Sequence, residues 1–474
     1  MRPWTWHRRT VTRRGFLGGG LAALGASIVA ACTRPPPRAA LDPIVFPDGP
    51  AVETDRAVGI QTRWPIKRVI YLMQENRSFD HVLGAFPGAN GATTGSLLGQ
   101  EVPLIRCPQW LPGDLPHNYR AALESIHGGK MDNFALPNFE EPDLAEVAAV
   151  YAYSQLHESD VPNYWHWARE YVLCDNFFAS VPGASYPNHL FFVAGHSGGV
   201  YDNPENVRTL PFPGGGRWKS WGCDGAEDAF VLSIGEGGII SRGRPCFDFP
   251  TVGDQLTDAD IPWAYYSSQP YQSGYIWNAY SAFPSIRGTD EWTKRIRPVD
   301  RLIDHIEEGA LPSVTWVTPR FPFSDHPAWS SSHAHNWLTE VVNAIMRSPM
   351  WAHTAIFMTW DEWGGFYDHV PPPKVDEIGM GIRVPLLVIS PYANRGQIDH
   401  EVGEFSSPLK FIQTNWGLEH HTERIRLTHD FSHAFDFEQP PRPPDPRAPK
   451  RDAIGDPLVH PGTDPSWPKR FRKD

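Results

Sequence analysis

Short apolar runs rich in β-branched and aromatic residues recur along the chain, and they predict buried strands. They cover residues 68–73, 313–317, 355–359 and 384–389. Longer stretches between or beside them predict helices at 143–157, 300–309, 335–347 and 407–415. Strands that alternate with helices favour a mostly parallel sheet covered on both faces. The pattern therefore predicts an α/β fold.

The same pattern divides the chain into four parts. We expect a signal peptide at 1–31, a linker at 32–65, a catalytic domain at 66–441 and a Pro-rich tail at 442–474. Within the domain, residues 205–246 are rich in Gly, Trp and Pro, which is typical of a long insertion that acts as a lid or substrate loop.

The first 31 residues carry an export signal. Arg13 and Arg14 form a twin-arginine pattern, and the apolar segment 17–31 behind them is too short and too rich in small residues for a comfortable transmembrane helix. We therefore expect export by the twin-arginine machinery to the periplasm, the cell surface or the medium. Residues 29–32 also resemble a lipobox, which predicts a lipid anchor at Cys32; simple cleavage near Ala31 is the alternative.

Charge excludes one class of partner. The net charge is −12, and the part after residue 31 is more acidic because the first 31 residues hold five arginines and no acid. An acidic protein without a basic stripe is a poor ligand for nucleic acid, so no nucleic-acid partner is expected. Electrostatic adhesion to anionic membranes is disfavoured for the same reason.

Five cysteines are present, and an exported protein can oxidise them. If Cys32 carries lipid, four remain, which permits two disulfides. We favour a bond between Cys223 and Cys246, which would close a Gly-rich loop; free buried thiols are the alternative.

Polar residues follow two of the predicted strands directly. Glu75 and Asn76 come after the strand at 68–73, and Asp361 and Glu362 come after the strand at 355–359. Open α/β sheets place their chemistry beyond the carboxyl ends of their strands. Carboxylate and amide oxygens converging there suit a divalent cation, so these four residues predict a metal-assisted hydrolase.

A nucleophile candidate lies between these two segments. Ser185 follows a Pro/Gly turn and opens an apolar helix-like stretch, where free backbone N–H groups suit a phosphate oxygen. A serine hydroxyl beside a divalent cation loses its proton more readily and can attack. Taken alone, Ser185 is better explained as a helix-capping or turn residue.

Five motifs in one order resemble a known family. They are ENRSFDH, PHNYRAALESIHGGKMDNF, SVPGASYPNHLFF, SDHP at 324–327, and WDEWGGFYDHVPPP. From about Lys67 to Arg442 the chain is similar to secreted bacterial phospholipases C, a family that includes a respiratory-burst-inhibiting acid phosphatase and is related to the alkaline phosphatase superfamily. The resemblance implies an α/β/α sandwich of the alkaline phosphatase type with a mostly parallel sheet, one divalent metal and a phosphorylated enzyme intermediate.

The resemblance also assigns roles. It implies Glu75, Asn76, Asp361 and Glu362 as the metal ligands and Ser185 as the nucleophile. His117 would contact the phosphoryl group, His326 would protonate the leaving alcohol, and Asp325 would orient His326 or stabilise its charge. Asp368 and His369 lie on the loop that begins with Asp361 and Glu362, and from this position we expect them to pack against and hydrogen-bond that loop; support of the metal ligands is the functional option. His400 occupies a position that is histidine in relatives.

The leading hypothesis is an exported phospholipase C that cleaves phospholipids or other phosphate esters. The metal could be calcium, magnesium, manganese or zinc. An acid phosphatase that acts on monoesters is the nearest alternative, and a non-catalytic surface lipoprotein is an alternative of another class. Aromatic side chains could surround a choline group. A Cys-x-Pro-x-Arg motif is absent from the sequence, which argues against an arylsulfatase.

Overall fold

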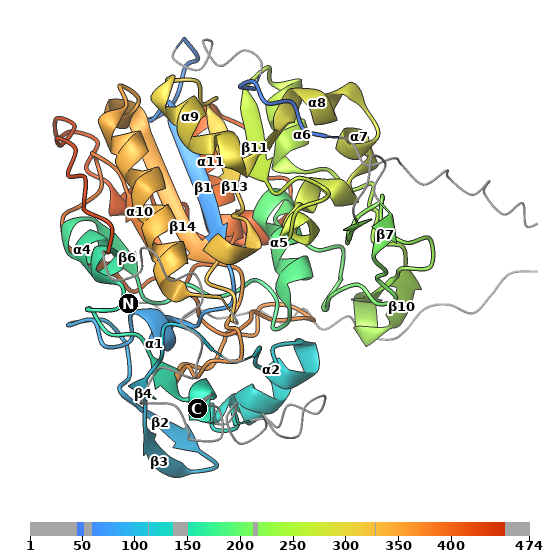
Figure 1. Ribbon diagram of the computed structural model, residues 1–474, viewed down its shortest axis with the longest axis vertical. Helices are drawn as coiled ribbons and strands as arrows, with labels where there is room; N and C mark the ends of the chain where they lie inside the picture. Colours follow the sequence, from blue (N-terminus) through green and yellow to red (C-terminus); the bar gives the residue numbers. More distant parts are fainter. Residues whose placement is uncertain are drawn as a thin grey trace, which may run out of the picture. The chain divides into compact units, whose positions relative to one another are not determined.

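The apolar runs form the middle of one large sheet (Figure 1). The structure is a computed structural model that describes residues 45–51, 59–111, 113–135, 150–211, 217–327 and 329–450, all within the compact unit 40–474. The predicted signal peptide at 1–31 and Cys32 lie outside the described residues, as do 33–44 and 52–58 of the predicted linker and 451–474 of the predicted tail.

The central sheet has eight strands in the order β12-β11-β13-β1-β14-β15-β6-β16. Their bounds are β1 (Arg68–Gln74), β6 (Val172–Cys174), β11 (Trp263–Ser267), β12 (Ile296–Pro298), β13 (Val314–Val317), β14 (Thr354–Trp360), β15 (Leu386–Ile389) and β16 (Gln397–Asp399). Neighbours are parallel except at β15, which runs antiparallel to both β14 and β6. All four predicted strands are present, and the predicted mostly parallel sheet is confirmed.

Helices cover both faces of this sheet (Figure 1). On β14, Phe357 packs against Phe411 of α11, whereas Trp360 packs against Tyr164 of α4. Side chains an odd number of positions apart on a strand point to opposite faces, so α4 and α11 lie on opposite sides. The predicted α/β/α layering is therefore confirmed.

The helices are mostly short. They are α1 (Phe79–Val82), α2 (Tyr119–Ile126), α4 (Pro162–Glu170), α5 (Ser185–Ala194), α6 (Val252–Asp258), α7 (Pro284–Arg287), α8 (Asp290–Arg295), α9 (Leu302–Glu307), α10 (Ser331–Arg347), α11 (Ser406–Trp416) and α12 (Glu423–Leu427). The predictions at 300–309, 335–347 and 407–415 correspond to α9, α10 and α11.

The helix predicted at 143–157 is wrong at its C-terminal end. Residues 143–149 lie outside the described ranges, and Ser154–Gln155 form strand β5, paired with β4 (Ile105–Arg106). The Gln155 amide donates to the backbone carbonyls of Asp80 and Ala92 at 2.6 and 2.8 Å. These long-range bonds outweigh the local helical preference.

Small hairpins surround the main sheet. One consists of β2 (Thr94–Leu97) and β3 (Gln100–Pro103); two lie in the predicted insertion, β7 (Leu210–Pro211) with β8 (Arg217–Trp218) and β9 (Val231–Ile234) with β10 (Ile240–Gly243). The predicted disulfide between Cys223 and Cys246 is confirmed in this insertion, and Cys107 and Cys174 are free and buried. The second disulfide that four cysteines would permit is therefore not formed.

The predicted tail begins along α10. The side chain of Asn343 donates to the carbonyl of Arg447 at 2.6 Å and accepts from its N–H at 2.8 Å.

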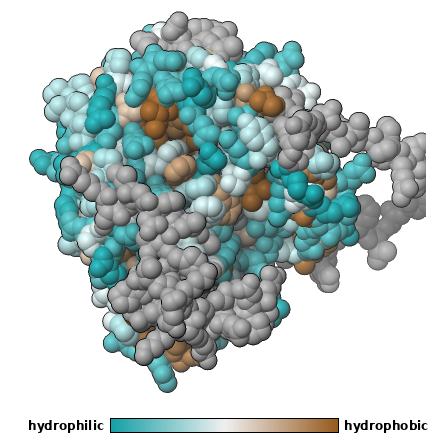
Figure 2. Space-filling model, viewed as in Figure 1, coloured by the Kyte–Doolittle hydropathy of each residue, from teal (hydrophilic) through white to brown (hydrophobic). Residues whose placement is uncertain are grey.

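The face seen in Figure 2 is mainly hydrophilic with small separate hydrophobic patches. Across the described ranges, no helix combines the length and the apolar character that a membrane crossing requires.

Removing the disulfide should loosen the insertion locally. A Cys223→Ser/Cys246→Ser variant is expected to lose about 2–4 kcal/mol of local stability, because the open loop gains conformational freedom. Amide hydrogen exchange at 217–243 measures this loss, with Cys107→Ala as the control. Unchanged protection of these amides in the double variant would contradict the prediction.

Candidate active site

Two loops meet at the carboxyl edge of the sheet because β1 and β14 are parallel neighbours in register, with Gln74 opposite Trp360. Asp361 N–H donates to the carbonyl of Gln74 at 2.9 Å, and Asn76 N–H donates to Asp361 Oδ1 at 2.7 Å. The structure thus brings together the four predicted ligands, Glu75, Asn76, Asp361 and Glu362, all fully buried.

The close approach of these loops depends on a glycine. Gly364 has φ +64°, and a Cβ there would lie 2.2 Å from the backbone oxygen of Asn76. Asn76 itself has φ 60°, a left-handed conformation that Asn tolerates better than most residues. The WGG segment of the second motif therefore meets a steric requirement of the site.

Ser185 is the first residue of α5, and its hydroxyl faces the two loops. The proximity of this hydroxyl acts to lower the pKa values of Glu75 and Asp361, against the stronger effect of burial. Asn188 holds the preceding turn, since its Oδ1 accepts from the N–H of Val181 at 3.0 Å and its Nδ2 donates to the carbonyl of Ala184 at 3.2 Å. The predicted nucleophile therefore lies beside the predicted ligands on a fixed helix end.

His189 is a site residue that our sequence reasoning missed. Its Nε2 lies 2.8 Å from Glu75 Oε1 and 3.9 Å from Asp361 Oδ2. Burial lowers its pKa to about 4, so the ring is neutral and Nε2–H donates to Glu75. The signal was available: His189 is four residues after Ser185, a spacing that places both on one face of a helix.

The burial and the unpaired oxygens of the four predicted ligands indicate whether these residues suit a bound cation. Burial raises the pKa values of Glu75, Asp361 and Glu362 well above their usual range, and the charges of neighbouring carboxylates add to this effect at Asp361 and Glu362. Each predicted ligand keeps an oxygen without a hydrogen-bond partner among the described residues: Glu75 Oε2, Asn76 Oδ1, Asp361 Oδ2 and Glu362 Oε1. Buried polar atoms are rarely left unpaired. The donor set fits a divalent cation held by oxygen atoms.

His117 and His326 lie next to this group. The Nδ2 of Asn76 lies 3.2 Å from Nε2 of His117, whose Nδ1 donates to the carbonyl of Leu115 at 2.7 Å. The rings of His117 and His326 are 6.0 Å apart. Both histidines that the sequence singled out therefore border the same space as the ligands.

Asp114 is a second residue that the sequence reasoning missed. Its Oδ2 is 3.7 Å from Nε2 of His326, and its Oδ1 is 3.5 Å from Nδ1 of His117. Burial lowers the pKa of His326, and the charge of Asp114 acts in the opposite direction. No spacing signal marks Asp114, because the loop that carries it meets His326 only in three dimensions.

Asp325 is buried but has other partners than those we expected. Its Oδ2 accepts from Trp360 Nε1 at 3.1 Å and from the Tyr164 hydroxyl at 3.3 Å. Burial raises its pKa to about 6. The acid in contact with the His326 ring is Asp114, and an orienting role of Asp325 toward His326 stays a prediction.

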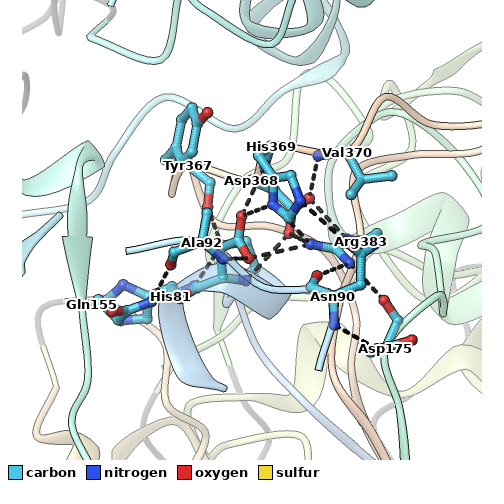
Figure 3. Close-up of polar contacts among 12 residues, drawn as sticks. His81, Asn90, Ala92, Gln155, Asp175, Tyr367, Asp368, His369, Val370 and Arg383 are labelled. Carbon is cyan, nitrogen blue, oxygen red and sulfur yellow. Dashed lines mark hydrogen bonds and ion pairs between the residues drawn. The ribbon is translucent and has the colours of Figure 1, made fainter. Parts of the chain in front are cut away.

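A buried ionic network anchors the end of the loop that begins with Asp361 (Figure 3). Arg383 donates to Asp368 through Nε at 2.9 Å and to Asp80 through Nη2 at 3.2 Å. The His369 ring and backbone N–H both contact Asp80 Oδ2, at 2.6 and 2.8 Å. Asp80 lies on α1, directly after the loop that follows β1, so the network ties the loops after β1 and β14 together. Asp368 and His369 make hydrogen bonds at this loop, as expected, and a role in supporting metal ligands stays a prediction.

His400 lies elsewhere. Its Nδ1 contacts Asp175 at 2.8 Å, and Asp175 accepts from the N–H of Asn90 at 2.6 Å. Among the described residues, His400 makes no hydrogen bond to the residues around Ser185.

The chain matches the model of the Phosphoesterase family over residues 66–419. It belongs to the Phosphoesterase family. Curated relatives include the hemolytic phospholipase C of Pseudomonas aeruginosa, 25% identical over 92% of this chain and 62% of the relative. Phospholipase C B of Mycobacterium tuberculosis is 24% identical over 80% of each chain, and non-specific phospholipase C3 of Arabidopsis thaliana is 25% identical over 74% of this chain and 68% of its own.

The chain spans 62% and 63% of two of these relatives, the hemolytic enzyme and a non-hemolytic phospholipase C of Burkholderia pseudomallei. Similar solved structures include a member of the alkaline phosphatase superfamily from Vibrio parahaemolyticus, with TM-score 0.36 and 11% identity over 83% of this chain and 74% of that one. The lipoteichoic acid synthase LtaP from Listeria monocytogenes gives TM-score 0.37 and 8% identity over 79% and 80%. These scores are low, and the fold assignment rests on the sheet itself.

Removing the arginine at the centre of the ionic network should destabilise the whole domain. Arg383→Met leaves Asp80 and Asp368 buried without their cation, and breaking such a pair is expected to lower the free energy of unfolding by roughly 3–5 kcal/mol. Urea unfolding measures the loss. Arg395→Met, which removes an arginine paired with Glu170 at the surface, is the control and should change little. Equal stability of the two variants would contradict the prediction.

His189 should matter more for metal affinity than for folding. His189→Gln keeps a donor toward Glu75 but changes its reach, so we expect about 10–100-fold weaker metal binding with the fold retained. Equilibrium dialysis against divalent metal gives the affinity, and thermal unfolding checks the fold. Wild-type metal affinity in this variant would show that His189 does not position Glu75.

Proposed function

We propose that the chain is an exported, metal-dependent phosphoesterase of the phospholipase C type that acts through a phosphoserine intermediate. The observation that carries this proposal is the position of the Ser185 hydroxyl beside Glu75 and Asp361, within a set of buried oxygens that have no partner among the described residues. Phospholipase C relatives from bacteria and a plant, matched over 74–92% of this chain, support a phospholipid as the substrate.

Glu75, Asn76, Asp361 and Glu362 would hold one divalent metal ion. Bound there, the ion supplies positive charge that offsets the charge of the phosphoryl group and favours the ionised form of a nearby hydroxyl. Oxygen ligation suits calcium, magnesium or manganese, and His189 as a neighbour also makes zinc compatible.

The chain's own residues perform the remaining steps. Ser185 releases its hydroxyl proton to solvent, and its Oγ attacks phosphorus to form a phosphoserine as the bond to the leaving alcohol breaks. His326, held beside Asp114, donates a proton to the departing oxygen, and His117 contacts the phosphoryl group. Water then attacks the phosphoserine and gives its proton to His326, the bond between phosphorus and Oγ breaks, and Ser185 Oγ takes up a proton from solvent. Burial excludes bulk water and strengthens each of these interactions.

Hydrolysis of p-nitrophenylphosphorylcholine, compared with p-nitrophenyl phosphate, tests the proposal. The wild type should cleave the diester, and Ser185→Ala should lose at least about 1,000-fold in kcat because the nucleophile is absent. Ser241→Ala, an exposed serine on β10, is the matched control and should keep full activity.

The outcomes separate the alternatives. Cleavage of the monoester alone would assign the chain as a phosphatase on the same scaffold. Absence of turnover on both substrates, with each candidate metal supplied, would favour a non-catalytic surface protein.

Chelation tests the metal requirement. Dialysis against a chelator should abolish turnover, because three buried carboxylates would then lack a counter-charge, and one of calcium, magnesium, manganese or zinc should restore it. Turnover that persists in the metal-free protein, verified by elemental analysis, would contradict metal dependence.

Export is the last part of the proposal, and it rests on residues 1–31. Arg13→Lys/Arg14→Lys should retain the protein in the cytoplasm, because the export machinery reads the arginine pair. Fractionation of cells that express the wild type and this variant measures the difference. Metabolic labelling with a fatty acid, with and without Cys32→Ser, reports the lipid anchor. Equal export of both proteins would contradict the twin-arginine route.

A further inference from the structure

Two histidines and an aspartate gather at the far edge of the sheet. Asp399 is the last residue of the edge strand β16 and is 3% exposed. His429 and His433 belong to the segment that follows α12 and forms the short helix η10 (Ser432–Ala434). One nitrogen or oxygen from each of the three side chains lies within 4.8 Å of the others.

The contacts inside this cluster leave one nitrogen free. Nε2 of His433 lies 2.9 Å from Asp399 Oδ2. His429 accepts a long hydrogen bond at Nδ1 from the N–H of Phe431, at 3.4 Å, while its Nε2 is buried with no partner in the described part of the chain. The ring centroids of the two histidines are 5.3 Å apart. A buried ring nitrogen without a partner, next to an imidazole and a carboxylate, is an available ligand.

The backbone holds the two rings in this arrangement. Phe431, midway between the histidines, has φ 56°, an uncommon conformation for a bulky residue. Its side chain is fully buried against Phe177 and Phe357, with centroids 6.1 and 5.9 Å away. Because the core fixes this turn, the histidines are positioned before any ligand arrives, which favours binding.

The ligand types select the metal. Two imidazoles and one carboxylate, with the histidines in an H-x3-H spacing, suit zinc or a similar transition-metal ion, whereas calcium and magnesium prefer oxygen alone. The side chain of His433 is 36% exposed, which gives an ion access from solvent. The buried thiol of Cys174, paired with Asp399 in the β6–β16 register, lies 3.9 Å from Asp399 Oδ2.

We propose that Asp399, His429 and His433 form a second metal site, specific for zinc-like divalent ions, that fastens the 428–434 segment to the edge strand. An ion there would replace the proton between His433 and Asp399. It would also move the ring proton of His429 to Nδ1, at the loss of the long contact to Phe431.

This site is separate from the catalytic centre. β15 and β6 lie between β14 and β16 in the sheet, which corresponds to about 14 Å at the usual spacing between strands. None of its three residues belongs to the group around Ser185. The proposal therefore does not depend on the proposed function, and its failure would leave that function untouched.

Zinc stoichiometry tests the proposal. The full chain, stripped of metal and dialysed against Zn²⁺ alone, is compared with His433→Gln by elemental analysis. We expect the variant to bind one zinc equivalent fewer than the wild type. Any zinc bound at the catalytic centre is the same in both proteins and cancels in this difference. The glutamine amide can still donate to Asp399, so the fold should persist, and circular dichroism verifies this.

Two further variants make the result specific. His429→Gln should also lose one equivalent or bind it at least about 10–100-fold more weakly. His400→Gln, an exposed histidine next to Asp399 in the chain that pairs with Asp175 instead, should bind as the wild type does. Phosphodiester hydrolysis in the His433→Gln variant should match that of the wild type when metal is supplied.

Two results would overturn the proposal. One is equal zinc content in the wild type, His433→Gln and His429→Gln, which would leave the cluster as an ion pair between His433 and Asp399. The other is a His400→Gln variant that binds one zinc equivalent fewer than the wild type, as His433→Gln does. That result would indicate non-specific binding of zinc at the surface.

Discussion

Hydrogen bonding between β1 and β14 sets Glu75 and Asp361 side by side, and the rest of the candidate site follows from that pairing. Parallel strands in register end at the same edge, so the residues after each strand must share one small volume. Three carboxyl groups and an amide are thereby forced together at positions that are fully buried in the free protein. Isolated ionised groups in such a place are strongly unfavourable, so the site needs compensating positive charge.

The protein supplies that compensation differently on the two sides of the loops that follow β1 and β14. On the α1 side, Arg383 neutralises Asp80 and Asp368 with a guanidinium that belongs to the fold itself. On the Ser185 side, the donors that the described residues offer to the carboxylates are neutral, such as the backbone N–H of Asn76 and the ring of His189. The first group is thus complete as a structural element, whereas the second has unpaired oxygens that suit a bound cation.

Local sequence was sufficient wherever chemistry follows a strand directly. The four predicted ligands, Glu75, Asn76, Asp361 and Glu362, follow apolar runs, and Ser185 opens a helix. The hydrophobic pattern of the strands and the turn residues before the helix therefore predicted where these residues lie. Asp114 could not be found this way, because it reaches His326 only through the packing of separate loops. Asp325 shows the converse: its neighbour in sequence is His326, yet its carboxylate accepts from Trp360 and Tyr164. At 154–155, hydrogen bonds to β4 and α1 replaced the expected helix, which no local propensity encodes.

The reversed direction of β15 has a consequence for how this enzyme scaffold can vary. A parallel successor to β14 would need a crossover that carries the chain back to the opposite edge. Because β15 is antiparallel, the whole connection from residue 361 to residue 385 stays at the edge that holds Ser185. It begins with two proposed ligands and ends with the Arg383 anchor, and the exposed stretch between them bears no strand. That stretch can lengthen, shorten or change composition while the register of the sheet stays fixed, so it can diverge independently of the proposed ligands and of the Arg383 anchor.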